Sequence, residues 1–237
     1  MRTRVATLAL LGVLALAASA DAAQNKRLHA LATRYDAHLR EARPDLGSRA
    51  GIGGCSDRLV PLTQSSLTAD AALLAALLDS TAVLQREWLT RRDRRALVAL
   101  HDRIEREAAP LRAGVWRREP SAYLPLAHDA IMEVARQPHV SPCERERRSL
   151  CRLRAVPEVL RAAEVNLAAG AVFDPDSEVT RWNAALGELR TTLPGLFAEC
   201  HDAERFADLV EADSLALGAG RHFVARLRAP ALGASAP

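Results

Sequence analysis

One stretch decides the class of the fold: residues 141–156, with the sequence SPCERERRSLCRLRAV. Ser141 stands at an expected helix N-cap, and Pro142 takes the first helical position, where its missing amide hydrogen costs nothing. Glu144 follows at the place from which a carboxylate reaches back toward the cap. The stretch therefore predicts a helix with a sharply defined start, which Pro157 then restarts or kinks.

Helical periodicity continues on both sides of this stretch. Apolar residues recur every three or four positions, and Ala and Leu dominate where strands would need Val, Ile and Thr. We expect further helices around the apolar stripes of residues 28–39, 73–84, 97–104, 123–134, 179–189 and 206–227. The sequence thus predicts an all-α fold, an antiparallel array of about seven to eight helices without a sheet.

Breaker residues set the expected helix boundaries. The first helix should stop before Pro44, because the residue that precedes a proline avoids the helical region. Thr68 is a plausible cap for the second helix. Gly51-Ile52-Gly53-Gly54 is rich in glycine, but no strand precedes it, so we interpret it as a turn and not as a phosphate-binding loop.

Composition indicates a folded protein and disfavours a nucleic-acid ligand. Of 237 residues, 49% are apolar, 26% charged and only 4% aromatic. The formal net charge is +3 and falls to +1 without Arg2 and Arg4. Arginines and glutamates alternate along the helices, as they do on solvated faces, and few aromatic side chains are present to stack on bases.

The first twenty residues are typical of a secretory signal. Arg2 and Arg4 form a basic start, residues 5–18 are apolar, and Ala18-Ser19-Ala20 offers small residues for cleavage. Cleavage after Ala22 is an equal alternative. The apolar run is shorter than the about 20 residues that a membrane span needs. The sequence therefore predicts export to the periplasm or the extracellular space.

The expected organisation follows from this signal. Residues 1–20 form the signal peptide, residues 21–229 one helical domain, and residues 230–237 a disordered tail. The last segment is small and apolar and lacks periodicity, which explains why we assign it no helix.

Export bears on the four cysteines Cys55, Cys143, Cys151 and Cys200, because thiols pair in an oxidising compartment. Four thiols allow three connectivities, and the sequence does not choose among them. If Cys143 and Cys151 share one helix, their Cα atoms lie about 12 Å apart, which is beyond disulfide reach. A bridge from one of these two to Cys200 is favoured over a bridge between them.

A metal site is the alternative interpretation of these cysteines. Cys143, Cys151 and Cys200 could act together with His139 or His201. The chain has no CxxC pair, however, and disulfides or buried free thiols are favoured.

Catalytic motifs are missing from the sequence. A zinc-peptidase helix carries HExxH, whereas His101, His128 and His201 are each followed by Asp. No GxSxG turn and no Cys/His signature occurs either. We predict surface or helix-end positions for these histidines, and we assign no catalytic, cofactor-binding or metal-binding residue.

Two polar stretches have structural explanations. Residues 116–123 combine Trp, Tyr and Arg and could form a binding surface, but packing onto a pair of helices is favoured. The acidic pairs Glu144 with Glu146 and Asp174 with Asp176 lie at expected helix starts, where the helix dipole explains them.

Four short motifs, taken in order, resemble a bacterial family. They are Arg43-Pro44-Asp45-Leu46-Gly47-Ser48, Asp57-Arg58-Leu59, Arg118-Glu119-Pro120-Ser121-Ala122-Tyr123-Leu124 and Arg152-Leu153-Arg154-Ala155-Val156-Pro157. Their order and spacing resemble the amino-terminal half of the family catalogued as domain of unknown function 885. The resemblance extends over residues 28–227.

The resemblance implies an exported or lipid-anchored, largely helical protein. Family members are more than twice this length, and a His-Glu-x-x-Pro-Gly-His-His stretch in their carboxy-terminal half makes them look like zinc-dependent peptidases. No residue of this chain matches that stretch, so no metal or catalytic role is carried over. The implied counterpart is a helical front half that packs beside a catalytic half and walls one side of its cleft.

The sequence thus leads to one expectation and two alternatives. We expect an exported helical protein that corresponds to the non-catalytic front half of a peptidase-like protein and has no cofactor. One alternative is half of a split zinc-dependent peptidase, whose partner would be a separately encoded catalytic half or another exported protein. The other is a Cys/His metal-binding protein. We expect no nucleic-acid partner and, after signal removal, no membrane partner.

Overall fold

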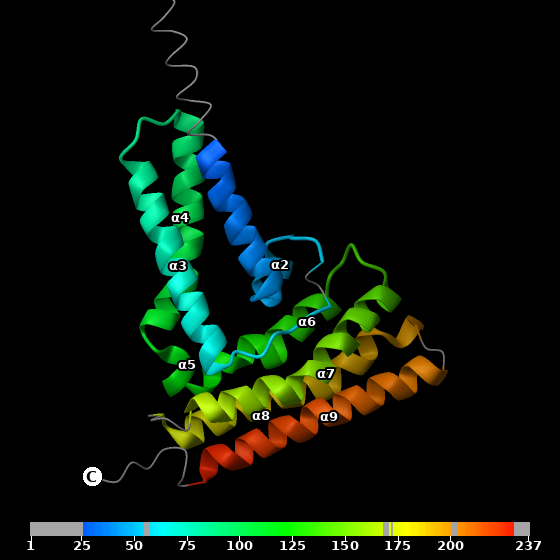
Figure 1. Cartoon of the computed structure of the whole chain (residues 1–237). Helices are drawn as coiled ribbons and strands as arrows, with labels where there is room; N and C mark the ends of the chain where they lie inside the picture. The colour runs from blue at the N-terminus through cyan, green and yellow to red at the C-terminus, as the bar shows by residue number, and fades with distance from the viewer. Residues whose placement is uncertain (1–25, 55–56, 168–170, 172, 201–202, 230–237) are drawn as a thin grey trace, which may run out of the picture. The chain divides into compact units, whose positions relative to one another are not determined.

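The computed structural model describes residues 26–54, 57–167, 171, 173–200 and 203–229, and their regular secondary structure is helical without a strand. This confirms the predicted all-α, multi-helix fold. The chain forms a helix over residues 26–41, then α2 (Pro44–Arg49), α3 (Gln64–Gln85), α4 (Arg91–Arg112), α5 (Val115–Arg118), η1 (Pro120–Tyr123), η2 (Pro125–Asp129), α6 (Ala130–Ala135), α7 (Pro142–Leu167), α8 (Pro175–Leu196), η3 (Ala198–Cys200) and α9 (Ala203–Arg228) (Figure 1). The predicted signal peptide and tail lie outside the described residues.

The chain divides into two compact units. Unit 1 comprises Met1–Ala37 and Ala71–Ala109, and unit 2 comprises His38–Asp70 and Pro110–Pro237. The division passes through α3 and through α4, and in α4 it falls at Pro110, the proline inside that helix.

Successive helices of unit 1 alternate in direction. The α3 and α4 helices form a hairpin (Figure 1). Arg27 pairs with Glu87 near the start of α4, and the hydroxyl of Tyr35 donates to Oε2 of Glu107 near its end, at 3.0 Å. The helix over residues 26–41 therefore runs parallel to α4 and antiparallel to α3.

Helix α3 is the one helix in the described part of the chain that is long and apolar enough to cross a membrane. The same composition suits the core helix of a bundle. Leu74, Leu77 and Leu84 are almost completely buried. Each such leucine contributes about 1.5–3 kcal/mol relative to full exposure, so packing within unit 1 uses part of the apolar surface of α3.

Unit 2 is built on three helices, α7, α8 and α9, that lie side by side (Figure 1). The rings of Trp182 on α8 and Phe223 on α9 pack with their centroids 4.8 Å apart. Glu164, near the end of α7, lies 3.7 Å from His222, near the end of α9. Helices α7 and α9 are therefore parallel, and α8 runs antiparallel to both.

The core of unit 2 centres on α7. Its buried apolar face consists of Leu153, Val156, Val159, Leu160, Ala163 and Leu167. Pro157 does not restart this helix, because α7 continues through it as one helix of 26 residues. Val156 and Val159 on either side of the proline are buried, and this packing offsets the lost backbone hydrogen bond.

One helix start differs from the predictions, and one helix end agrees with them. Helix α3 begins at Gln64 and not after Thr68, because the hydroxyl of Thr63 accepts the amide hydrogen of Ser66 at 3.1 Å and forms an earlier cap. The first helix stops before Pro44, as predicted, and Pro44 opens the short helix α2 at its first position.

The predicted fourth helix is three short helices. A 3₁₀-helix (η1), a π-helix (η2) and α6 follow one another between Pro120 and Ala135. Pro120 opens η1 and Pro125 opens η2. Neither proline can donate a backbone hydrogen bond, so one continuous α-helix ladder is interrupted twice.

A disulfide joins Cys143 at the start of α7 to Cys200 just before α9, with Cα atoms 5.1 Å apart. This confirms the predicted bridge from one of the two α7 cysteines to Cys200. Cys151 lies two turns further along α7 and is a free thiol. Cys55 lies outside the described residues. The bridge ties together the ends of the two parallel helices.

Loss of this disulfide should destabilise unit 2. The bridge closes a loop of 57 residues, and the chain-entropy relation gives a stabilisation of about 4 kcal/mol for such a loop. We expect the double substitution Cys143→Ser/Cys200→Ser to lower the free energy of unfolding in urea by about 3–4 kcal/mol. Cys151→Ser is the matched control and should change it little; equal losses for both variants would contradict this account.

Candidate functional site

The motifs that carry the family resemblance meet inside unit 2. Arg43 donates from Nε and Nη2 to the two carboxylate oxygens of Asp45, at 3.2 and 3.0 Å, and both side chains are buried. The guanidinium carbon of Arg43 lies 5.5 Å from the centre of the Trp116 ring. The first motif thus supplies an internal, two-pronged ion pair stacked on an aromatic ring.

The fourth motif places an arginine in the interior. Arg152 is completely buried and donates from Nη1 to the backbone carbonyl of Ala130 on α6. Burial lowers the pKa of Arg152, while the nearby carboxylates of Asp45 and Glu133 act in the opposite direction. Asp45 therefore links the first and fourth motifs through charge.

The third motif also faces inward. The hydroxyl of Tyr123 donates to the backbone carbonyl of Trp116 at 2.7 Å, and the two rings meet edge to face at 5.2 Å. Burial raises the pKa of Tyr123 to about 12. Trp116 and Tyr123 are both buried, so the aromatic side chains of this stretch pack in the interior, whereas Arg117 and Arg118 are exposed.

Asn166, which the sequence did not single out, joins these parts. Its Nδ2 donates to the hydroxyl of Tyr123 at 2.8 Å and to the backbone carbonyl of Leu62. Its Oδ1 is buried and has no hydrogen-bond partner among the described residues. Buried carbonyl oxygens normally accept a hydrogen bond, so this atom is an exception in the interior of unit 2.

A pocket of about 550 Å³ opens beside Asn166. Its volume lies in the range of small-ligand sites, about 300–1,000 Å³. The segment before α3 forms one wall and the second half of α7 the other, with the lining residues Pro61, Thr63, Gln64, Ser65, Glu158, Arg161, Ala162, Val165 and Asn166. We call this the α3–α7 pocket. Its lining combines apolar surface, hydroxyl groups and one charge of each sign.

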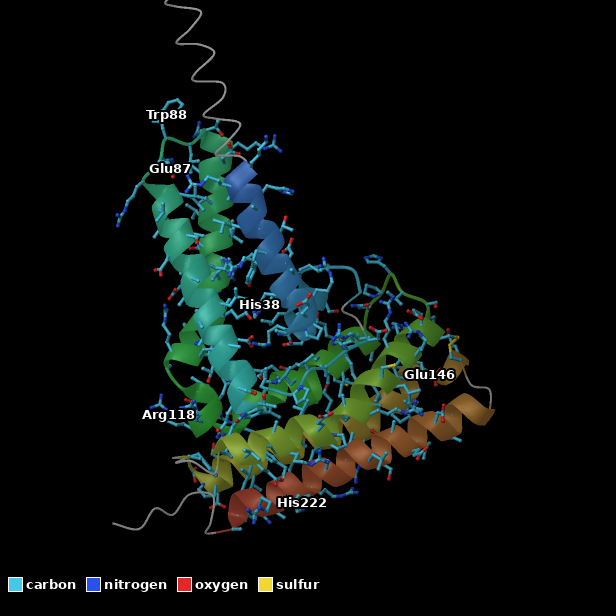
Figure 2. The ribbon with its side chains drawn as sticks, viewed as in Figure 1. His38, Glu87, Trp88, Arg118, Glu146 and His222 are labelled. Carbon is cyan, nitrogen blue, oxygen red and sulfur yellow. A yellow bond between two sulfur atoms is a disulfide. The ribbon has the colours of Figure 1, made fainter. Side chains whose placement is uncertain are left out.

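A second pocket, of about 450 Å³, lies beside the disulfide at the start of α7, where Figure 2 labels Glu146. Glu144 accepts hydrogen bonds of 2.7–2.8 Å from Arg147 and Arg148. Arg147 and then Arg148 lower the pKa of Glu144 to about 2. Arg147 also lies 3.6 Å from Asp57. These charges are balanced within the chain.

His128 on η2 lies between the carboxylates of Asp129 on η2 and Glu188 on α8. Nδ1 of His128 forms a hydrogen bond of 2.7 Å with Asp129. Its Nε2 lies 3.2 Å from Glu188 on α8, at ion-pair distance. The hydrogen bond with His128 lowers the pKa of Asp129. Arg136 pairs with Glu188 at 2.7 Å. The group links η2 to α8 through charge, and no nucleophile joins it within the described residues.

The predicted helix-start roles of the acidic pairs are confirmed in part. Asp174 caps α8 by accepting the amide hydrogen of Asp176 at 3.3 Å. Ser141 accepts the amide hydrogen of Glu144 at 3.4 Å, as expected of a cap. The Glu144 carboxylate, in contrast, turns to the arginines of α7 and not back to the cap. Charged hydrogen bonds are the stronger interaction here.

The Cys/His metal alternative loses two of its proposed ligands, because the sulfurs of Cys143 and Cys200 are bonded to each other. His139 lies exposed in the turn before α7, and His201 is outside the described residues. In the part of the chain that the structure describes, no group of three or more His, Cys, Asp or Glu side chains could hold a metal ion.

Comparison with known proteins returned no match among protein-family models, curated proteins or solved structures.

Replacing Glu144 should change how stability depends on pH. Because the pKa of Glu144 is depressed to about 2, its ion pairs stabilise the fold above the ordinary carboxyl pKa and lose this effect as pH falls toward 2. We expect Glu144→Gln to cost about 0.5–1 kcal/mol at neutral pH, since the pair is solvent-accessible, and the deficit to shrink on acidification.

Urea denaturation at neutral and acidic pH measures this deficit. Glu211→Gln is the control, because Glu211 is exposed on α9 and forms no ion pair with the described residues. A Glu144→Gln deficit that stays constant down to acidic pH would refute the assigned role.

Proposed function

We propose that this chain is an exported helical binding module without catalytic activity of its own, equivalent to the front half of a peptidase-like protein. One observation carries the proposal: the resembling motifs supply the interior of unit 2. Leu59, Tyr123, Leu153 and Val156, from three of the four motifs, belong to one buried apolar cluster. Arg43 and Asp45 of the remaining motif form the buried ion pair beside Trp116.

The motif residues therefore stabilise the interior of unit 2, and they do not form an open reaction centre. Arginines and carboxylates that bind each other in the interior are unable to activate a substrate at the same time. A binding module needs such a rigid frame, because side chains held by packing keep a ligand-contacting surface in place.

The ligand-contacting surface we propose is the α3–α7 pocket, and the ligand is a short peptide segment. Asn166 lines the pocket, and its Oδ1 is an acceptor without a partner among the described residues, which suits a backbone N–H. Glu158 and Arg161 offer an acceptor and a donor, and Ala162 with Val165 adds apolar surface. This combination fits a chain of amide groups that carries side chains of mixed polarity.

The disulfide supports the exported location that is part of this proposal. The disulfide between Cys143 and Cys200 is a bond that persists in oxidising compartments. A periplasmic or extracellular location is consistent with the predicted secretory signal, and cell fractionation followed by mass measurement of the processed chain tests it.

Catalysis is tested on the oxidised chain with zinc and a mixture of peptides. We expect no metal-dependent hydrolysis above background, and a known zinc peptidase in the same assay establishes its sensitivity. Hydrolysis that rises in proportion to the amount of chain and stops on chelation would overturn the non-catalytic assignment.

Peptide binding is tested by ligand-observed NMR with a defined mixture of short peptides. Ala162→Trp fills the α3–α7 pocket, whereas Ala184→Trp adds the same ring at an exposed position of α8. We expect Ala162→Trp to abolish saturation transfer and Ala184→Trp to preserve it. Equal transfer in the unmodified chain and in both variants would exclude the pocket as the binding site.

A separately encoded catalytic half is the second candidate partner. Val165 beside the α3–α7 pocket and Val210 and Leu215 on α9 are each more than half exposed, and exposed apolar side chains favour protein partners where they form a patch. An adjacent reading frame that encodes a His-Glu zinc motif, together with co-purification of the two chains and gain of hydrolysis, would favour this split peptidase. Unrelated adjacent sequence would remove it.

A further inference from the structure

The loop between α3 and α4 carries an exposed tryptophan. The side chain of Trp88 is 79% exposed, whereas Trp116 and Trp182 are 7% and 1% exposed. Figure 2 shows Trp88 at the end of the hairpin, where it points away from both helices. Its indole therefore contributes little to the packing of unit 1, although large aromatic side chains are normally well buried.

Arginines surround this tryptophan. Five of them occur within residues 86–95, and all five are exposed: Arg86, Arg91, Arg92, Arg94 and Arg95. We call residues 86–95 the basic tip. None of the five arginines has an ion-pair partner in the part of the chain that the structure describes.

The acidic residues of the basic tip are engaged elsewhere. Glu87 pairs with Arg27 of the helix over residues 26–41. Asp93 accepts a hydrogen bond from the Thr90 hydroxyl at 2.8 Å and donates its amide hydrogen to the same hydroxyl at 3.1 Å, which caps α4. The basic tip has a formal charge of +3, equal to that of the complete chain.

Helix stability does not explain these arginines. Three of them stand in the first turn of α4 and Arg95 follows directly, at the N-terminal end of the helix, which carries a partial positive charge. Cations are unfavourable there, and they also repel one another. The exposed charges are therefore available to bind an anionic partner.

A groove in unit 1 adds apolar surface to this charge. It encloses about 410 Å³ between the helix over residues 26–41 and α3. Leu31, Val83 and Leu84 contribute the apolar lining, and Arg27 and Arg34 contribute two positive charges. Arg27 also pairs with Glu87, the neighbour of Trp88, which places this groove next to the basic tip.

We propose that the basic tip docks unit 1 reversibly on lipid bilayers that contain anionic phospholipids. Trp88 enters the headgroup region, where an indole finds both apolar and hydrated surroundings. The five arginines bind the phosphates, and anionic leaflets attract each such charge. This proposal rests on the proposed export only, and it differs from the sequence-based expectation of no membrane partner after signal removal.

The apolar components favour a bilayer over other anionic ligands. Nucleic acids and acidic proteins would match the arginines, but they would leave the indole and the groove without an apolar counterpart. Interfacial anchors typically combine Arg or Lys with Trp, Phe or Leu. The predicted signal peptide also ends a few residues before Lys26, so this end of unit 1 is nearest along the chain to the membrane during export.

Sedimentation with vesicles tests the proposal on the processed chain purified after export. Equal parts of phosphatidylglycerol and phosphatidylcholine provide the anionic surface, and pure phosphatidylcholine provides the neutral one. We expect binding to the anionic vesicles alone and a marked loss at high salt, where the Debye length falls to about 3 Å. Because Trp116 and Trp182 are buried, a blue shift of tryptophan emission reports on Trp88.

Substitutions separate local from global charge. Arg91→Gln/Arg92→Gln should weaken partitioning about 25-fold, at about fivefold for each arginine near the surface. The control Arg190→Gln/Arg228→Gln removes the same charge from exposed positions of α8 and α9 and should have little effect. Trp88→Ala should weaken binding about tenfold and abolish the blue shift. Because the Trp88 side chain is exposed, its removal should leave the midpoint of thermal unfolding unchanged.

Three results would overturn the proposal. The first is equal partitioning on neutral and anionic vesicles. The second is an equal loss for the two arginine pairs, which would reduce the effect to net charge. The third is tighter binding to single-stranded DNA or polyglutamate than to anionic vesicles, which would assign the basic tip to a nucleic acid or an acidic protein.

Discussion

Burial of one face of α7 is the constraint on which unit 2 depends. The apolar side chains of that face draw α6, α8 and α9 together, but hydrophobic burial alone has no direction. The same helix carries Arg152 and Asn166 into the interior, and an unsatisfied buried polar group costs about 1–3 kcal/mol. Their hydrogen bonds to Ala130, Tyr123 and Leu62 therefore select one arrangement among those that bury α7.

The same constraint explains why the resembling motifs lie inside unit 2. Residues from Arg43 to Val156 contribute to one interior through a buried ion pair, an edge-to-face ring pair and a carbonyl contact. The α3–α7 pocket borders this interior at Asn166, whose Nδ2 is committed to the fold while its Oδ1 has no partner in the described residues. A ligand at this atom would bind to a side chain that is already held in place, which lowers the entropy cost of recognition.

Unit 1 uses its residues differently. Its leucines and Tyr35 form a small core, Glu107 accepts a hydrogen bond from Tyr35, and Asp93 takes part in the cap of α4. What remains at the α3–α4 turn is positive charge and an indole, neither of which the unit needs for stability. In unit 2, polar side chains bind one another in the interior. In unit 1, the arginines gather on the surface at the α3–α4 turn.

Local chemistry alone accounted for much of this molecule. Repeating leucines and alanines, Pro142 at a helix start, and Asp174 at a cap act within one or two helical turns, so the all-α class could be read directly. Pro157 does not end its helix, because the burial of its neighbours outweighs its missing amide hydrogen.

Contacts between distant segments required the packed structure. The geometry of a single helix excluded a bond between Cys143 and Cys151, but it could not decide which of them meets Cys200. The contacts of His128 with Glu188 and of Asn166 with Leu62 gave no signal in the sequence. Such pairs depend on the relative direction of whole helices, which is set by the sum of many weak contacts and not by any short motif.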